Sequence, residues 1–211
     1  MYQTNLPDYL SEEALWNALQ KGDEQAYKQI FVQYSDALLS YGLKFTPNRS
    51  LVKDCVQMVY VHLFASRARL GVVGNIKGYL LVMMKHELMA QLSNRQYAMA
   101  RLEEIPSFYI DASACTLPHD GMDDETYRRH CKLMKALDQL PPRQKEAIYL
   151  YYIQEIPLKE IAVLMNMEYQ SLRNLLSRSL RTLRSMLTSV PAIPLLLLLK
   201  SSARYFSTFP C

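Results

Sequence analysis

One stretch near the C-terminus, "MNMEYQSLRNLLSRSLRTLRSML", carries side chains whose types suit contact with nucleic acid. Its polar residues recur at steps of one, three and four, which places them on one face of a helix: Gln170, Arg173, Asn174, Ser177, Arg178 and Arg181. Arg binds guanine edges or phosphates, Asn and Gln pair with adenine, and Ser pairs with either base. No Asp or Glu follows Glu168 in the chain. The pattern predicts a DNA-reading helix; the alternative is an exposed helix that is merely basic.

The opposite side of this helix is an apolar stripe that must pack on a partner element. It consists of Leu172, Leu176, Leu180, Leu183 and Leu187. A preceding helix over residues 157–165 ends at Asn166, a residue type that tolerates the left-handed backbone of a sharp corner. Ala162 is small enough to let a crossing helix approach closely, and Glu168 suits the start of the second helix. These features predict a helix-turn-helix.

The charges of the chain are segregated along its length. Residues 1–100 hold 10 Lys+Arg and 8 Asp+Glu, residues 101–131 hold 3 and 7, and residues 132–211 hold 11 and 5. A basic C-terminal part beside an acidic middle favours a polyanionic partner for the C-terminal part. The alternative is that these charges are ordinary solvated faces.

Residues that would support catalysis or metal binding are not arranged in a known motif. The sequence has no Gly-rich phosphate loop, no HExxH and no nucleophile elbow, so an enzyme and a cofactor are not expected. The four cysteines form no CxxC pair, which is typical of a reducing compartment. A zinc site would have to combine Cys115, His119, His130 and Cys131. Adjacent His130 and Cys131 suit one tetrahedral ion poorly, so no metal is expected.

The elements that position these residues are predicted to be helices throughout. Gly is scarce, with 6 residues, while strong helix formers are plentiful and strand alternation is hard to find. Helices are expected over 12–20, 24–45, 51–64 and 76–95, with Ser11, Asp23 and Ser50 as N-caps. Together they form one compact domain over residues 8–97.

The remainder of the chain divides into a linker, a second domain and a tail. Periodicity is lost over 98–123, which is acidic and contains Pro and Gly, so a flexible linker is expected. Helices resume over 124–188. The tail over 189–211 includes "AIPLLLLL", which is far shorter than the ~20 residues of a bilayer span. The N-terminus lacks the features of a signal peptide, so a cytoplasmic protein without a membrane span is expected.

Both predicted domains resemble parts of one protein family. The stretch "LDQLPPRQKEAIYLYYIQEIPLKEIAVLMNMEYQSLRNLLSRSLRTLRSML" resembles region 4 of bacterial RNA polymerase sigma factors of the extracytoplasmic-function (ECF) group, in the form common in Bacteroidetes-type members. Upstream, "GDEQAYKQIFVQYSDALLSYGLKFTPNRSLVKDCVQMVYVHLF" and "IKGYLLVMMKHELMAQLSNRQ" resemble region 2 of the same group. The resemblance covers most of residues 20–97 and 130–187. It implies a region 2 helical bundle followed by a region 4 helix-turn-helix.

The resemblance implies roles for residues of the first domain. Asp54 and Gln57 fall on the face that contacts core RNA polymerase, where Met58 replaces the family's usual Glu. The element that opens and reads the minus-ten promoter region holds Tyr79, Lys85, His86, Asn94 and Arg95. His86 stands where the family commonly has Asn. Tyr79 is expected either to stack on an exposed base or to pack in the core.

In the second domain the resemblance assigns readers of the minus-thirty-five promoter region. They are Gln170, Ser171, Arg173, Asn174, Ser177, Arg178 and Arg181. Asn166 replaces the family's turn glycine, and Leu175 replaces a frequent Arg, which is expected to narrow the exposed row.

The function that these resemblances imply is that of an alternative sigma factor. Its partners would be core RNA polymerase, promoter DNA and an anti-sigma factor. A rival function is a helix-turn-helix regulator that is not a polymerase subunit. A response regulator would need a βαβ receiver in the first half, which the helical pattern over 23–97 argues against.

Overall fold

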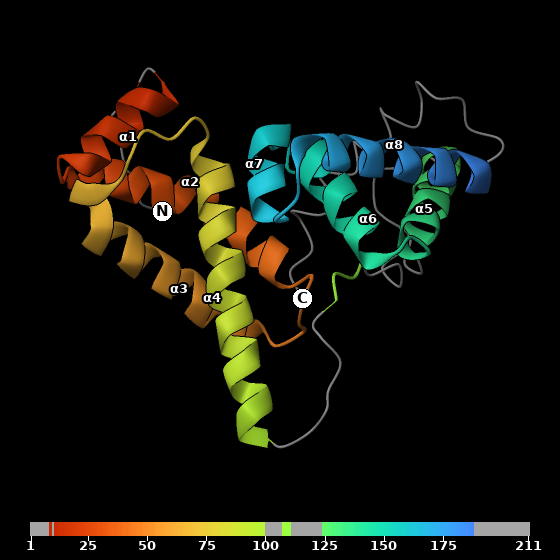
Figure 1. Cartoon of the computed structure of the whole chain (residues 1–211), viewed down its shortest axis with the longest axis horizontal. Helices are drawn as coiled ribbons and strands as arrows, with labels where there is room; N and C mark the ends of the chain where they lie inside the picture. Colours follow the sequence, from red (N-terminus) through yellow and green to blue (C-terminus); the bar gives the residue numbers. More distant parts are fainter. Residues whose placement is uncertain (1–8, 10, 100–106, 111–123, 188–211) are drawn as a thin grey trace. The chain divides into compact units, whose positions relative to one another are not determined.

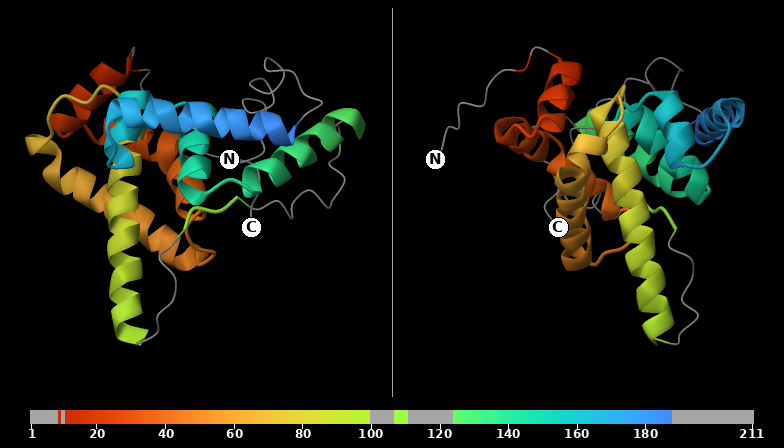
Figure 2. Two further views of the ribbon diagram at one scale, coloured as in Figure 1. Left: turned by 45° about the vertical axis from the view of Figure 1, so that its right-hand side comes forward. Right: turned by 60° about the vertical axis from the view of Figure 1, so that its left-hand side comes forward.

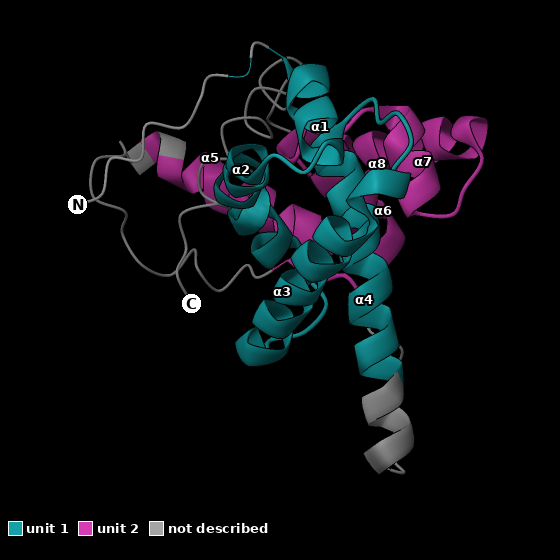
Figure 3. Cartoon of the chain, turned by 90° about the vertical axis from the view of Figure 1, so that its left-hand side faces the viewer, with its two compact units in different colours: residues 1–106 teal, residues 107–211 magenta. Residues whose placement is uncertain are grey.

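The computed structural model describes residues 9, 11–99, 107–110 and 124–187, and the side chains of 94–99, 124 and 126 are outside this description. The chain divides into two compact units, residues 1–106 and residues 107–211 (Figure 3). Every regular element in the described ranges is a helix, so the predicted all-α class is confirmed (Figure 1). The predicted linker over 98–123 and the tail over 189–211 fall largely outside these ranges, and the domain boundaries stay predictions.

Unit 1 is a bundle of four α-helices with one short 3₁₀ turn. The helices are α1 (Glu12–Gln20), α2 (Glu24–Gly42), α3 (Arg49–Ser66) and α4 (Ile76–Met99), with η1 (Arg67–Arg69) after α3. Figure 2 shows that the helices α3 and α4 cross each other. Helix α2 packs on both of them, and their facing apolar stripes form the core.

Side-chain caps set where the helices of unit 1 begin. Ser11 Oγ accepts a hydrogen bond from the Ala14 amide at 3.1 Å, and Asp23 Oδ1 accepts from the amide of Gln25 at 2.8 Å. Both caps confirm the prediction. The predicted cap Ser50 is wrong: Asn48 caps α3, its Oδ1 accepting from the Leu51 amide at 3.0 Å. Asn48 lies two residues earlier and is about as favourable an N-cap residue type as Ser, so the helix starts sooner than expected.

The three long helices of unit 1 approach most closely at Gly42, the last residue of α2. A Cβ added there would lie 2.5 Å from Val52 Cγ1 of α3 and 2.6 Å from Met84 Cε of α4. Any larger side chain would therefore push the helices apart, because protein cores are close-packed.

Helix α1 ties the connection between α3 and α4 to the bundle. The Trp16 indole N–H donates to the Gly71 carbonyl at 2.9 Å. The Glu12 carboxylate accepts from the Tyr34 hydroxyl at 3.0 Å and from the Ile76 amide at 3.3 Å. These bonds fix the entry to α4, the helix that carries the predicted minus-ten residues.

The described part of unit 2 contains four α-helices and one π-helical segment. They are α5 (Asp124–Asp138), α6 (Pro142–Ile148), the π-helix η3 (Tyr149–Ile153), α7 (Leu158–Leu164) and α8 (Tyr169–Met186). Helix α6 continues directly into η3, where the sequence predicts one ordinary helix. The Gln154 side-chain amide donates to the buried Tyr149 hydroxyl at 2.7 Å, and Glu155 then adopts a left-handed backbone with φ 55°. The widened turn and the left-handed residue redirect the chain toward α7.

Residues 107–110 belong to unit 2, although they lie inside the predicted linker. Phe108 and Ile110 are 3% and 2% exposed, and the Phe108 ring lies 5.3 Å from that of Tyr149. Two apolar side chains of the predicted linker are therefore buried in unit 2, while the extent and flexibility of the linker stay predictions.

Candidate nucleic-acid interface

The corner between α7 and α8 is a helix-ending Schellman motif. The Met167 amide donates to the Ala162 carbonyl at 2.9 Å, and the Asn166 amide donates to the Val163 carbonyl at 3.1 Å. Asn166 has φ 50°, which confirms the predicted left-handed residue. Glu168 is extended at the N-cap, and α8 begins at Tyr169. The corner thus fixes the direction in which α8 leaves α7.

Helix α8 separates a buried apolar face from an exposed polar face. All seven predicted minus-thirty-five residues are exposed: Gln170, Ser171, Arg173, Asn174, Ser177, Arg178 and Arg181. Leu172, Leu176, Leu183 and Leu187 are buried as expected, whereas Leu180 is half-buried. Leu175 is buried as well, so it belongs to the packing face and adds nothing to the exposed row, in line with the expected narrowing.

Local hydrogen bonds hold part of the exposed row of α8 in place. The Gln170 amide donates to Asn174 Oδ1 at 3.3 Å, and Arg178 Nε donates to the Asn174 carbonyl at 3.4 Å. Arg173 and Arg181 have no hydrogen bond or ion pair within the described part of the chain. Their guanidinium groups are therefore available to a base edge or a phosphate.

Arg184 extends the exposed row and was missed by sequence reasoning. It is exposed, and it lies three residues after Arg181 and seven after Ser177, so it continues the same face by one turn. The spacing that predicted the other residues would have found it. Arg184 also lies near Tyr152: burial raises the pKa of the Tyr152 phenol, and the positive charge of Arg184 partly opposes that rise.

The predicted polymerase contacts lie together on the outer face of α3. Asp54, Gln57 and Met58 are all exposed, with 38% of Met58 accessible. Val61, which sequence reasoning did not single out, is 49% exposed on the same helix. Gln57 and Met58 lie three and four residues after Asp54, and Val61 lies four and three residues after them. All four residues therefore share one face of the helix. This face mixes polar groups with two exposed apolar side chains.

The predicted minus-ten residues on α4 are in several different environments. Tyr79 is half-buried with its ring edge-on to Trp16, 5.3 Å between centroids, and burial raises the pKa of its phenol. Lys85 is half-buried, with Nζ 5.8 Å from the Phe45 ring centroid, while His86 is exposed. The side chains of Asn94 and Arg95 lie outside the description. Tyr79 and His86 are seven residues apart and share a face, whereas Lys85 is turned away from them.

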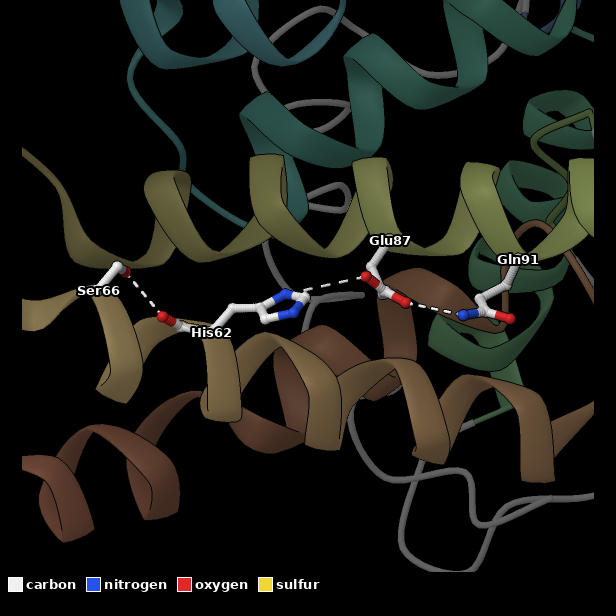
Figure 4. A network of polar contacts seen from close by, with 4 residues as sticks. All are labelled: His62, Ser66, Glu87 and Gln91. Carbon is white, nitrogen blue, oxygen red and sulfur yellow. Dashed lines mark hydrogen bonds and ion pairs between the residues drawn. The ribbon is translucent and has the colours of Figure 1, made fainter.

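A polar network links α3 to α4 (Figure 4). Gln91 donates to Glu87 Oε1 at 3.0 Å, and Glu87 Oε2 lies 4.0 Å from His62 Nδ1. Ser66 Oγ donates to the His62 carbonyl at 2.7 Å. The side chain of Glu87 is 15% exposed and that of His62 is 54% exposed, so the one contact that crosses from α3 to α4 lies at the edge of their interface.

The zinc ligands that were considered and disfavoured are not assembled in the described residues. His130 and Cys131 follow one another on α5, and Cys115 and His119 fall outside the description. No group of His, Cys, Asp or Glu that could hold a metal ion occurs within the described ranges. Likewise, none of the helices in those ranges combines the length and apolar character needed to cross a membrane.

Comparison with known proteins finds similarity to sigma factors. Residues 132–183 match the family model for region 4 of sigma-70. The ECF RNA polymerase sigma factor BldN of Streptomyces coelicolor is 23% identical over 169 residues, which is 80% of this chain and 62% of BldN. The chain therefore spans less than two thirds of the length of this curated relative.

Two solved structures have a similar fold. The sigma factor RpoE from Bartonella quintana, crystallised in complex with the anti-sigma factor NepR, has a TM-score of 0.56 and 18% identity. The match covers 78% of this chain and 98% of that one. CnrH, in complex with the cytosolic domain of CnrY, has a TM-score of 0.52 and 14% identity, with 85% and 99% covered. At these identities the likeness concerns the fold alone.

Proposed function

We propose that this chain is an alternative sigma factor of the ECF group, of the Bacteroidetes type, which directs core RNA polymerase to specific promoters. The observation that carries the proposal is the coincidence of the region 4 match over 132–183 with a helix-turn-helix that exposes an unbroken polar row on α8. Unit 1 precedes it, as region 2 precedes region 4, and the similarity to BldN extends over 80% of the chain.

In this proposal α8 enters the major groove at the minus-thirty-five element. Gln170, Asn174 and Arg173 supply the donors and acceptors that discriminate bases, and Arg178, Arg181 and Arg184 supply positive charge for phosphates. The Gln170–Asn174 hydrogen bond orients two amides before DNA arrives, which lowers the entropy lost on binding.

Unit 1 supplies the polymerase contact and the minus-ten contact. The face of α3 with Asp54, Gln57 and Met58 binds core polymerase, its apolar side chains forming the centre of the contact. Helix α4 captures bases that leave the stack near the start site, which costs a few kcal/mol. Tyr79 contributes mainly by packing on Trp16, and His86 offers the exposed polar group.

The other properties of such a protein follow from this role. It catalyses no reaction, because polymerase supplies the chemistry, and it acts in the cytoplasm, where polymerase and promoters are. An anti-sigma factor is a further partner, supported by the complex in which RpoE was crystallised with the anti-sigma factor NepR.

Transcription with purified components tests the proposal. Core polymerase is combined with the full chain on a library of random promoter sequences, and transcript 5′ ends are mapped. The proposal expects new start sites that share two upstream elements. A chain that binds DNA without joining core polymerase or moving start sites would instead be the rival helix-turn-helix regulator.

A further inference from the structure

Helix α5 carries a row of cations that the α8 reading surface does not include. Arg128, Lys132 and Lys135 are all exposed, and their spacing of four and three residues places them on one face. At a rise of about 1.5 Å per residue, the row is about 10 Å long. These three residues form the cationic stripe of α5, called the stripe.

The carboxylates near the stripe already form ion pairs with other cationic side chains. Glu125 Oε1 lies 2.8 Å from Arg129 Nε, and Asp138 Oδ1 lies 2.8 Å from the largely buried Nζ of Lys145. The stripe residues themselves have no hydrogen bond or ion pair within the described part of the chain. Three positive charges on α5 are therefore not balanced by the carboxylates described on the same helix.

The stripe is also free of apolar side chains, unlike the face of α3. The large exposed hydrophobic residues among the described ones include Met58 and Val61 on α3, and none lies on α5. Protein interfaces generally have an apolar core, whereas phosphate contacts need only positive charge and hydrogen-bond donors. The composition of the stripe thus favours phosphate over a protein surface.

Helix α5, which carries the stripe, is a neighbour of α8. Helix α5 packs against α8, and Figures 1 and 2 show it beside the C-terminal half of α8, the half that holds Arg181 and Arg184. A polyanion bound along α8 would therefore continue toward α5. Duplex DNA presents about one charge per 1.7 Å of its axis, so several phosphates fall within the length of the stripe.

We infer that Arg128, Lys132 and Lys135 form a second, sequence-independent contact of unit 2 with the phosphate backbone of duplex DNA. The stripe adds to the affinity of unit 2 for any duplex and carries no base preference, because its side chains reach phosphates and not base edges. This inference rests on the proposed function only in taking duplex DNA as the ligand of unit 2.

The salt dependence of DNA binding tests the stripe. The full chain is titrated onto a labelled duplex of random sequence, without polymerase, at several salt concentrations between about 50 and 200 mM. Each phosphate contact contributes about 0.9 to the slope of log Kobs against log[salt]. The triple variant Arg128→Gln, Lys132→Gln, Lys135→Gln is expected to lower that slope by about 2.7.

Two control variants separate the stripe from general charge effects. Glu125→Gln with Arg129→Gln removes an ion pair from the same helix at constant net charge, and its slope is expected to match that of the wild type. Lys21→Gln, Lys28→Gln and Arg69→Gln remove three exposed charges from unit 1 and are expected to lower the slope by less than about 1. Far-ultraviolet circular dichroism checks that each variant is folded.

A folded stripe variant with the wild-type slope would overturn the inference, as would an equal loss in the unit 1 variant. A wild-type slope together with weaker binding to core polymerase would mean a protein-binding stripe, which also overturns it. The binding assay contains no polymerase. If the triple variant lowers the salt slope as expected but the wild-type chain never redirects transcription, only the proposed function is refuted.

Discussion

The two units present their candidate contacts in different ways. Unit 2 places its candidate base-reading residues on one face of one helix, and the packing face of α8 is a separate set of leucines. Unit 1 distributes its candidates over α3 and α4, and some of them also pack: Tyr79 against Trp16, and Lys85 over the ring of Phe45.

This difference has a consequence for what substitutions report. A substitution in the exposed row of α8 is expected to alter a contact with DNA without changing the fold, because those side chains have few partners in the described part of the chain. A change at Tyr79 or Lys85 alters the bundle as well as the contact. Function is therefore more cleanly separated from stability in unit 2 than in unit 1.

The largest effect is expected where the helices of unit 1 meet. Gly42→Val forces methyl groups against Val52 and Met84, so we expect about 2–3 kcal/mol of destabilisation. The chain has 1 Trp, and Trp16 lies in unit 1, so its fluorescence during urea unfolding reports on that unit. Gly71→Ala is the control, since nothing lies within 4 Å of an added Cβ there. An unchanged midpoint for Gly42→Val would contradict the close packing.

The next largest effect tests base reading by unit 2. Arg173→Ala is expected to remove about 1–3 kcal/mol of binding free energy at promoters with a good minus-thirty-five element. Transcription from these promoters should therefore fall about 5- to 150-fold. Promoters with a poor element should be little affected. Ser185→Ala, in the last turn of α8, serves as control. A uniform loss on all templates would mean that Arg173 binds phosphate.

A smaller effect is expected at the corner of unit 2. Asn166→Val places a β-branched residue at φ 50°, which should cost about 1–2 kcal/mol, whereas Asn166→Gly should be neutral or stabilising. Hydrogen exchange of the α8 amides measures this effect. If the units are independent, the Trp16 unfolding midpoint stays the same; a shifted midpoint would show that they unfold together.

The smallest effect is expected on the polymerase face of unit 1. Asp54→Lys reverses an exposed charge on α3, and such charges contribute at most about 1 kcal/mol, so core polymerase should bind about fivefold more weakly. Glu13→Lys, exposed on α1, is the matched control. Competition with labelled wild-type chain measures the affinity. Equal competition by wild type and Asp54→Lys would remove Asp54 from the contact.

The same difference between the units explains what the sequence could predict. The exposed row of α8 could be predicted from helical spacing, and the corner before it from the residue type of Asn166. Glu155 and the π-helix could not be predicted, because the widened turn depends on the buried Tyr149–Gln154 pair and has no local signature. Likewise Tyr79 could not be assigned to packing until its neighbour Trp16, 63 residues earlier, was known.

Some features could not be predicted because they depend on packing. Phe108 and Ile110 lie among prolines and acids, which are typical of a linker, yet both side chains are buried. Their burial depends on contacts such as that of the Phe108 ring with Tyr149, 41 residues later, which the local sequence does not show.

The burial of Phe108 shortens the tether between the two units. With Phe108 docked on Tyr149, only residues 100–106 join Met99 to Ser107, a span that reaches at most about 29 Å when fully extended. If Phe108 undocks from Tyr149, further residues are added to this span, which costs about 1.5–3 kcal/mol. Under the proposed function, one aromatic ring would thus make the binding energy depend on the spacing of two DNA elements.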